Sequence, residues 1–369
     1  MRIVAIAGSQ IPSDTANSIQ VMKACNALVQ LGHDLTLIVP GNRQSSTVNL
    51  KSHYGLQTDF HIEWLASSSR RLFTWQSVGR ARALQPDLLY TWMIQSAVFG
   101  LPFKIPTVFE IHIQPTGRLG PAWHRAFALL RGRKRLASIT QALVDVLERR
   151  HNIRFNADDV VIAPNGVELE RFASLPSAPE LARQTLNLPS TPTVMCTGHL
   201  YAGRGADLFL ALAKEIPQAH FVWVGGRPDD ITTWKSRAQS NNITFTGFIP
   251  NQDLPLYQSA ADVLLMPYSR SIMGSSGTAD SASVASPMKM FEYMAAGRAI
   301  VTADLPVIRE VLNEKNAVFC EPDDLGNWKL VIGELLADEP RRLVLGRQAR
   351  EDVEGYTWLA RAEKIMRGM

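Results

Sequence analysis

A lysine and a glutamate stand one helical turn apart in residues 286–297, SPMKMFEYMAAG. Because Ser286 is a good N-cap and Pro287 suits the first turn, the segment predicts a helix whose unpaired amide groups face the preceding loop. A helix N-terminus of this kind binds anions. Lys289 in the first turn costs stability unless an anionic ligand is bound, and Glu292 can point toward the same ligand. The alternative is a solvated Lys–Glu pair on an exposed helix.

Two glycine-rich turns are expected at the carboxyl ends of strands. Residues 198–205, GHLYAGRG, follow a predicted strand and open a helix. The glycines allow the backbone to approach a phosphate closely, and the Arg204 guanidinium offers two parallel donors to phosphate oxygens. Residues 224–227, VGGR, end the next strand, at the edge where open α/β sheets bind ligands. The alternative for residues 198–205 is an ordinary strand-to-helix turn with a surface arginine.

Parallel strands would bring these motifs to one edge, and the hydrophobic pattern predicts such strands in both halves of the chain. In the first half, a strand, a helix over 17–31 and a second strand form a βαβ unit, which implies a parallel sheet in a doubly wound α/β domain. The strands of this half are expected at 3–7, 35–39, 88–90, 107–111, 138–140 and 160–162. His112 follows one of them, where a histidine is either only a half-buried hydrogen-bonding residue or a functional one.

The second half repeats this architecture after the turn Pro164-Asn165-Gly166 and a linker over 174–192. Its strands are expected at 193–197, 220–224, 243–246, 263–266, 299–302 and 317–319. Residues 269–286 are rich in Ser, Gly and Ala, which indicates a mobile loop before the helix that carries Lys289. We therefore expect two domains of similar architecture.

Length and composition agree with two ordinary domains. The 369 residues exceed what one core usually holds, and the chain is 46% hydrophobic and 20% charged. The three cysteines are far apart, which argues against a disulfide framework or a cysteine metal site. Without a secretory signal or an apolar stretch of membrane-spanning length, a cytoplasmic location is expected. The net charge of +4 suits an anionic small ligand or surface, and nucleic acid is not expected as a partner.

Taken together, the chain resembles the family 4 retaining glycosyltransferases along nearly its whole length. The segments that carry the resemblance are 26–39, 109–112, 164–167, 198–205, 245–268 and 286–312. The resemblance implies the GT-B fold, in which two Rossmann-like domains face each other across a cleft. Residues 1–165 would form the acceptor-side domain, completed by a C-terminal helix over 356–369, and residues 166–355 would bind the nucleotide-sugar donor.

The resemblance also implies roles for individual residues. Glu292 would hold the ribose hydroxyls of the donor, and the segment from Gly247 to Ile249 would lie beside its base. Arg204 and the helix start would bind the diphosphate, while His112 would face the transferred sugar. The implied catalytic residues are His112, Arg204 and Lys289, and the other donor-site residues are Gly198, His199, Gly203, Gly225, Ser286, Pro287 and Met288.

The implied reaction moves a sugar from a UDP or GDP sugar to a hydroxyl acceptor, such as a lipid-linked sugar or a polysaccharide precursor. The donor is a co-substrate, so no cofactor is expected. No aspartate pair is placed like a DxD metal site, so retaining transfer without a metal is expected. Two positions depart from the family pattern. Val284 stands where a second glutamate is usual, and the usual basic pair is represented by His199 and Arg204.

Other functions share some of these features. A sugar-nucleotide epimerase of the GT-B fold needs the donor site but no acceptor. A nucleotide-sugar binding module that has lost its catalytic contacts is a further alternative, and the valine in place of the usual glutamate at position 284 is consistent with it. A dinucleotide-dependent oxidoreductase is disfavoured, because residues 8–13, GSQIPS, lack the glycine spacing of that fingerprint.

A basic stretch over 118–154 interleaves arginine and lysine with aromatic and aliphatic residues. This composition predicts either a solvated helix face or a helix that lies on an anionic membrane. On the second interpretation, residues 131–135 would bind the inner face of the membrane peripherally and the acceptor would be a lipid or a lipid-linked sugar.

Overall fold

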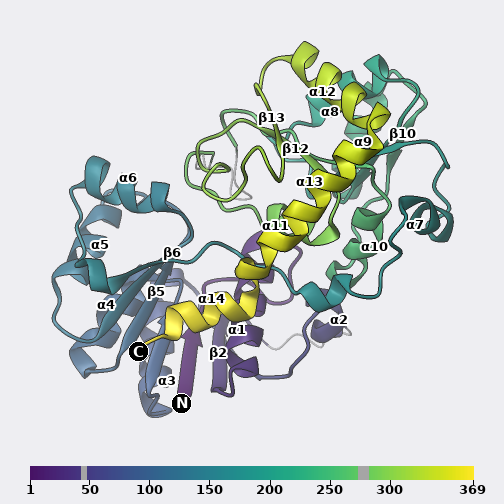
Figure 1. Ribbon diagram of the computed structural model, residues 1–369. Coiled ribbons are helices and arrows are strands. Elements are labelled where there is room, and N and C mark those ends of the chain that lie inside the picture. Colours follow the sequence, from purple (N-terminus) through teal and green to yellow (C-terminus); the bar gives the residue numbers. More distant parts are fainter. Residues whose placement is uncertain (43–47, 273–281) are drawn as a thin grey trace. The chain divides into compact units, whose positions relative to one another are not determined.

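The computed structural model describes residues 1–42, 48–272 and 282–369 (Figure 1). Contacts divide the chain into two compact units. Unit 1 comprises residues 1–165 together with 358–369, and unit 2 comprises residues 166–357. The mobile loop expected over 269–286 lies partly outside the described residues, since 273–281 are not among them.

Unit 1 contains a seven-stranded sheet in which every pairing is parallel. Its strand order is β3-β2-β1-β4-β5-β6-β7, so the sheet is doubly wound and the order reverses beside β1. The strands are β1 (Arg2–Ile6), β2 (Asp34–Pro40), β3 (His61–Leu65), β4 (Leu88–Thr91), β5 (Thr107–Ile111), β6 (Lys134–Ser138) and β7 (Val160–Ile162).

The helices of unit 1 pack in two groups. The C-terminal helix α14 lies against α1, as Figure 1 shows for the yellow and purple ribbons, while α4 packs against both α3 and α5. The helices are α1 (Ala16–Gln30), α2 (Leu50–Tyr54), α3 (Arg70–Ala83), α4 (Ile94–Gly100), η1 (Leu101–Phe103), α5 (Gly120–Leu129), α6 (Gln141–His151), η2 (Ala157–Asp159) and α14 (Trp358–Met366).

Unit 2 contains a six-stranded sheet, again with parallel pairings, in the order β10-β9-β8-β11-β12-β13. Its strands are β8 (Thr193–Thr197), β9 (His220–Val224), β10 (Ile243–Phe245), β11 (Val263–Met266), β12 (Ala299–Ala303) and β13 (Val318–Cys320). Its helices are η3 (Leu169–Phe172), α7 (Pro179–Thr185), α8 (Ala206–Glu215), α9 (Pro228–Arg237), η4 (Asn251–Asp253), α10 (Leu254–Ser259), α11 (Met288–Ala296), α12 (Leu325–Ala337), α13 (Glu339–Asp352) and η5 (Val353–Tyr356). The doubly wound α/β class expected from the sequence is confirmed in both units.

Two strands of unit 1 differ from the sequence-based expectation. Strand β3, an edge strand whose residues are all at least partly exposed, was not predicted. Strand β6 begins at Lys134, not at Ser138. The reason is that Lys134 and Arg135 look like surface residues, whereas Lys134 is buried and its ammonium donates to the carbonyls of Phe127, Ala128 and Leu130 at the end of α5.

Two arginines donate hydrogen bonds to backbone carbonyls at the C-terminal end of α14. Arg133 donates to the carbonyl of Gly368 at 2.7 Å, and Arg135 donates to the carbonyls of Ile365 and Arg367 at 2.5 and 2.7 Å. Cations at these positions satisfy helix-end carbonyls and interact favourably with the helix dipole. Three of the five residues expected to contact a membrane, Arg133, Lys134 and Arg135, therefore have partners within the protein, and membrane contact through residues 131–135 stays a prediction.

Buried aliphatic and aromatic residues fill both units, and the three cysteines are among the buried residues. Across the described parts of the chain, no helix combines the length and the apolar character needed to cross a membrane.

Candidate functional site

Three glycines follow neighbouring strands at the carboxyl edge of the unit 2 sheet. Gly198 follows β8, Gly225 follows β9, and Gly247 lies two residues after β10. The Gly198 amide donates to the Val224 carbonyl at 2.8 Å, and Gly225 forms an isolated bridge with Gly247. The sheet thus continues past its strands as a ledge of backbone without side chains, on which a ligand can lie close to the main chain.

The helix α11 places Lys289 over this ledge. A Cβ atom built on Gly198, whose φ is +121°, would lie 3.4 Å from Lys289 Nζ. The ammonium also lies 3.7 Å from Cys196 Sγ, and burial raises the pKa of that thiol, which keeps it neutral. Lys289 is only 9% exposed, and among the described residues it forms no ion pair. A buried cation without a carboxylate partner is costly, so an anion bound beside Lys289 would stabilise it.

Arg204 approaches the same point from the loop before α8. Its Nη1 donates to the Tyr268 hydroxyl at 3.4 Å, and its Cζ lies 5.5 Å from the centroid of that ring. Lys289 Nζ lies 5.3 Å from the same centroid. The buried Tyr268 therefore holds two cations on one aromatic ring.

The backbone around Arg204 is held in place by the segment that follows β11. Gly205, at φ +84°, is so close to Pro267 that a Cβ atom would lie 1.8 Å from the Pro267 carbonyl oxygen. The neighbouring Gly203 carbonyl accepts from the Ser269 amide at 3.1 Å. These contacts leave no room for a side chain at position 205 and fix the position of Arg204.

The N-terminus of α11 is one residue later than expected. Pro287 occupies the N-cap position with ψ 125°, an extended value that excludes it from the helix, and Met288 is the first helical residue. Ser286 is therefore not the N-cap, although it is buried just before the helix. Met288 and Lys289 are the first two residues of α11, so Lys289 stands in the turn whose backbone amides lack partners within the helix.

The remaining predicted donor residues have separate surroundings. Glu292 accepts from Gln258 Nε2 at 3.1 Å, one turn along α11 from Lys289. His199 stacks on Tyr201 with centroids 5.0 Å apart, and Ile249 is half-buried after Gly247. Val284, at the position where the family usually has a glutamate, is buried.

His112 belongs to unit 1, at the end of β5, and is held by a buried carboxylate. Its Nε2 lies 2.6 Å from Glu110 Oε1 and donates to it. Arg361 of α14 donates to both oxygens of Glu110, and the side chains of Gln20 and Tyr90 donate to them as well. In a neutral histidine, this leaves Nδ1 as the acceptor.

The negative charge of the buried Glu110 carboxylate is balanced by its neighbours. Burial by itself raises the pKa of a carboxyl, but the charge of Arg361 and the hydrogen bond from His112 outweigh it and hold the pKa of Glu110 well below its ordinary value. Burial also raises the pKa of Tyr90 well above its ordinary value, so the tyrosine stays a donor. Glu110 is thus an anion at neutral pH, and it fixes the orientation of His112.

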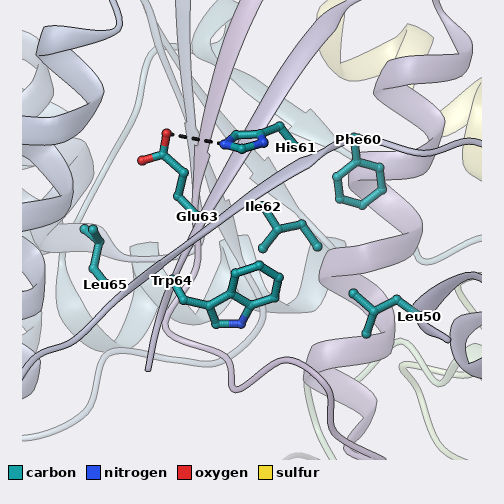
Figure 2. A pocket seen from close by; sticks show the side chains of 7 residues that line it. All are labelled: Leu50, Phe60, His61, Ile62, Glu63, Trp64 and Leu65. Carbon is teal, nitrogen blue, oxygen red and sulfur yellow. Dashed lines mark ion pairs between the residues drawn. The ribbon is translucent and has the colours of Figure 1, made fainter. Parts of the chain in front are cut away.

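An open hollow of about 490 Å³ lies elsewhere, along the edge strand β3 (Figure 2). Figure 2 shows His61 paired with Glu63, with Phe60 to the side and Leu50 and Trp64 below them in this view; His61 Nε2 lies 3.5 Å from Glu63 Oε1. None of the residues predicted to bind the donor lines this hollow.

Sequence reasoning left several of these residues without a role. Tyr268 and Glu110 both stand inside segments that carried the family resemblance, but nothing in their spacing indicates a contact with Arg204 or His112. Gln258 and Arg361 gave no signal, because each meets its partner only through the fold.

Sequence models of two related groups match the chain in succession. The model described as Glycosyltransferase Family 4 matches residues 18–171, and the model described as Glycosyl transferases group 1 matches residues 191–338.

Curated relatives match a part of the chain. A GDP-mannose-dependent α-(1-6)-phosphatidylinositol monomannoside mannosyltransferase of Mycolicibacterium smegmatis is 26% identical over 211 residues, which are 55% of this chain and 54% of that protein. The sulfoquinovosyl transferase of Arabidopsis thaliana is 24% identical over 207 residues, 54% of this chain and 38% of that protein. The chain spans about half the length of the curated relatives it matches.

Solved structures match the whole chain in fold. HepE of Anabaena in complex with UDP has a TM-score of 0.75 at 15% identity, covering 100% of this chain and 99% of its own. Sucrose-phosphate synthase from Thermosynechococcus elongatus has a TM-score of 0.75 at 18% identity, covering 100% and 98%. At these identities the likeness shows the fold, which is the two-domain α/β architecture expected from the sequence.

Proposed function

Because the chain belongs to the family 4 glycosyltransferases of the GT-B fold, we propose that it transfers a sugar from a nucleotide-diphosphate sugar to a hydroxyl group of an acceptor. The observation that carries this proposal is the pair of cations, Arg204 and Lys289, held on the Tyr268 ring beside the N-terminus of α11. Two fixed cations and free helix amides suit a diphosphate.

The donor is proposed to lie along the glycine ledge of unit 2. Its diphosphate would contact Arg204 and Lys289, and Glu292 would accept hydrogen bonds from the ribose hydroxyls. The base would lie near Gly247 and Ile249. UDP and GDP sugars are the first candidates, since the mycobacterial relative is named as GDP-mannose-dependent and HepE was solved with UDP.

The acceptor is proposed to be a hydroxyl of a lipid-linked sugar or of a polysaccharide precursor. The mycobacterial relative is named for a phosphatidylinositol monomannoside acceptor, which supports this class. A lipid-linked acceptor would bring the enzyme to an anionic membrane surface.

Transfer is proposed to retain the anomeric configuration. The bond between the anomeric carbon and the diphosphate oxygen breaks, the acceptor oxygen bonds to the same face of that carbon, and the acceptor proton passes to the departing diphosphate. Position 284 holds a buried valine, so it offers no carboxylate nucleophile. His112 Nε2 donates to Glu110, and in a neutral histidine Nδ1 would then accept from a sugar hydroxyl, which suits a residue that positions the sugar.

Charge on the departing diphosphate is proposed to be met by Arg204, Lys289 and the α11 amides, without a divalent cation. Preorganised donors of this kind often supply the largest share of catalysis. The adjacent aspartates of unit 2 have other positions: Asp229 and Asp230 lie in the first turn of α9, and Asp324 accepts from the Asn327 amide as the N-cap of α12.

The test has two stages. A thermal-shift screen of UDP, GDP, ADP and CMP sugars identifies the donor, because a ligand at 100 times its Kd stabilises the native state by about 2.7 kcal/mol. Turnover of that donor is then measured with and without phosphatidylinositol vesicles or alkyl glycosides as acceptors. Consumption that requires an acceptor supports transfer, rearrangement without an acceptor indicates an epimerase, and binding without turnover indicates a binding module.

A further inference from the structure

One surface of unit 1 carries far more positive than negative charge, and on its helix α3 the cation Arg80 is paired with a carboxylate, Glu63 of β3. We call the outer surface of α3, α4, η1 and α5 the basic face, and none of these four elements contains an aspartate or glutamate. Residues 66–144 contain eleven Lys and Arg but only two Asp and Glu, whereas the rest of the chain holds 27 Lys and Arg and 32 Asp and Glu. The charge of the protein is therefore strongly polarised toward this segment.

The two acidic residues of this segment are engaged elsewhere. Asp87 accepts from the backbone amide of Arg2 at 2.7 Å, and Glu110 is buried against Arg361. Eight exposed cations of the segment form no ion pair within the described residues: Arg70, Arg71, Arg82, Lys104, Arg118, Arg125, Arg131 and Arg133. Of these, Arg125 and Arg133 donate to the backbone carbonyls of His151 and Gly368.

Large apolar side chains stand among these cations. Trp75 on α3 is 63% exposed, and Leu129 at the end of α5 is 76% exposed. The Trp75 ring stacks on Phe99 of α4 at 4.6 Å, and Phe99 meets Trp123 of α5 at 5.5 Å, so the three helices present one continuous surface. Leu72, Phe103 and Leu119 are also exposed on these elements or beside them.

The start of α3 shows that this arrangement does not serve helix stability. Ser69 caps the helix by accepting from the Leu72 amide at 3.2 Å, and Arg70 and Arg71 follow in the first turn. Cations at a helix N-terminus oppose its dipole and cost stability unless an anion lies nearby.

We propose that the basic face docks on an anionic phospholipid bilayer. Arginines and lysines contact the headgroups, while Leu72, Trp75, Phe103 and Leu129 enter the interface between headgroups and acyl chains. A nucleic acid would match the charge but would leave the aliphatic side chains in water, whereas a bilayer takes both groups. The inference rests on charge and exposure in unit 1 and is independent of the proposed transferase activity.

The test is flotation of the full chain, without donor or acceptor, with vesicles of pure phosphatidylcholine and with vesicles that also contain phosphatidylglycerol. We expect binding only to the anionic vesicles, and loss of binding in high salt. In the double variant Arg70→Glu/Arg71→Glu, the loss of each cation is expected to weaken partitioning onto anionic vesicles about fivefold. The two new negative charges are expected to weaken it further. Trp75→Ala keeps the charge and is expected to weaken partitioning through the lost anchor.

The matched control is Lys235→Glu/Arg347→Glu, which changes the net charge equally at two exposed helical positions of unit 2. It is expected to bind anionic vesicles far better than the α3 variant does, and thermal melting verifies that all variants are folded. Equal loss in both double variants, equal binding of the wild type to neutral vesicles, or no vesicle binding overturns the proposal. Binding of an RNA oligonucleotide in place of vesicles, abolished by the α3 variant, also overturns it and assigns the face to nucleic acid.

Discussion

Arg361 on the last helix donates two hydrogen bonds to the buried carboxylate of Glu110, from Nη2 to Oε1 at 2.6 Å and from Nη1 to Oε2 at 3.2 Å. Both side chains are almost fully buried, and they lie 251 positions apart in the sequence. The carboxylate also holds His112, so the C-terminal helix takes part in orienting the histidine proposed to face the sugar.

Removing the charge of Glu110 is expected to destabilise unit 1. Glu110→Gln leaves the guanidinium of Arg361 buried without its counter-ion, and breaking a buried pair in this way costs about 3–5 kcal/mol. Urea denaturation of the variant and the wild type measures the change. Glu215→Gln, which breaks the exposed pair with Lys329, is the control and should change stability little. A stability loss in Glu110→Gln no larger than in the control would contradict the account of this pair.

The same carboxylate predicts a pH dependence. Its folded-state pKa is lowered, so its contribution to stability is complete above its ordinary pKa of 4.5 and is lost as the pH falls through the folded-state value. The wild type should therefore lose stability below about pH 4.5, by at most about 1.4 kcal/mol per pH unit from this group. Denaturation midpoints between pH 7 and pH 3 check this. Glu110→Gln should show a smaller slope, and equal slopes would rule out Glu110 as the cause.

Arg204→Ala is expected to lower turnover more than it weakens donor binding. Negative charge on the diphosphate grows toward the transition state, so the lost donor matters most there, by about 10²- to 10³-fold in kcat. Steady-state kinetics and calorimetric donor binding separate the two effects. Arg204→Lys retains the charge but not the fork and should be intermediate. Equal losses in kcat and affinity would assign Arg204 to ground-state binding alone.

Glu292→Gln is expected to weaken nucleotide binding roughly tenfold, because a carboxylate accepts hydroxyl bonds more strongly than an amide does. Isothermal calorimetry with the nucleoside diphosphate measures this. Glu339→Gln, at the exposed start of α13, is the matched control and should bind like the wild type. Unchanged affinity in Glu292→Gln would remove this residue from the donor site.

Transfer is expected to retain configuration and to continue in EDTA. The anomeric configuration of the product is read from its proton couplings by NMR, and rates are compared with and without the chelator. An inverted product would exclude front-face attack. Activity that disappears in EDTA and returns with magnesium or manganese would show that Arg204 and Lys289 do not suffice for the diphosphate charge.

The local sequence pattern was sufficient for most strands of both sheets. Thr107–Ile111 and Val263–Met266 have the bounds that the sequence predicted, because a short apolar run between turn residues specifies a buried strand locally. The pattern failed at Lys134–Ser138, where two cations begin a strand. Their partners are the terminal carbonyls of α5 and α14, which become neighbours only after folding.

The sequence by itself determined the α/β class, the family and the kinds of residue at the proposed donor site. The tertiary structure alone decided which of these residues meet. Tyr268 contacts both Arg204, 64 positions before it in the sequence, and Lys289, and Arg361 binds Glu110, 251 positions before it. Periodicity reports only which face of an element is buried, whereas the partner of a buried charge depends on how the sheets bring distant segments together. For that reason Glu110, Tyr268 and Arg361 acquired a role only in the folded protein.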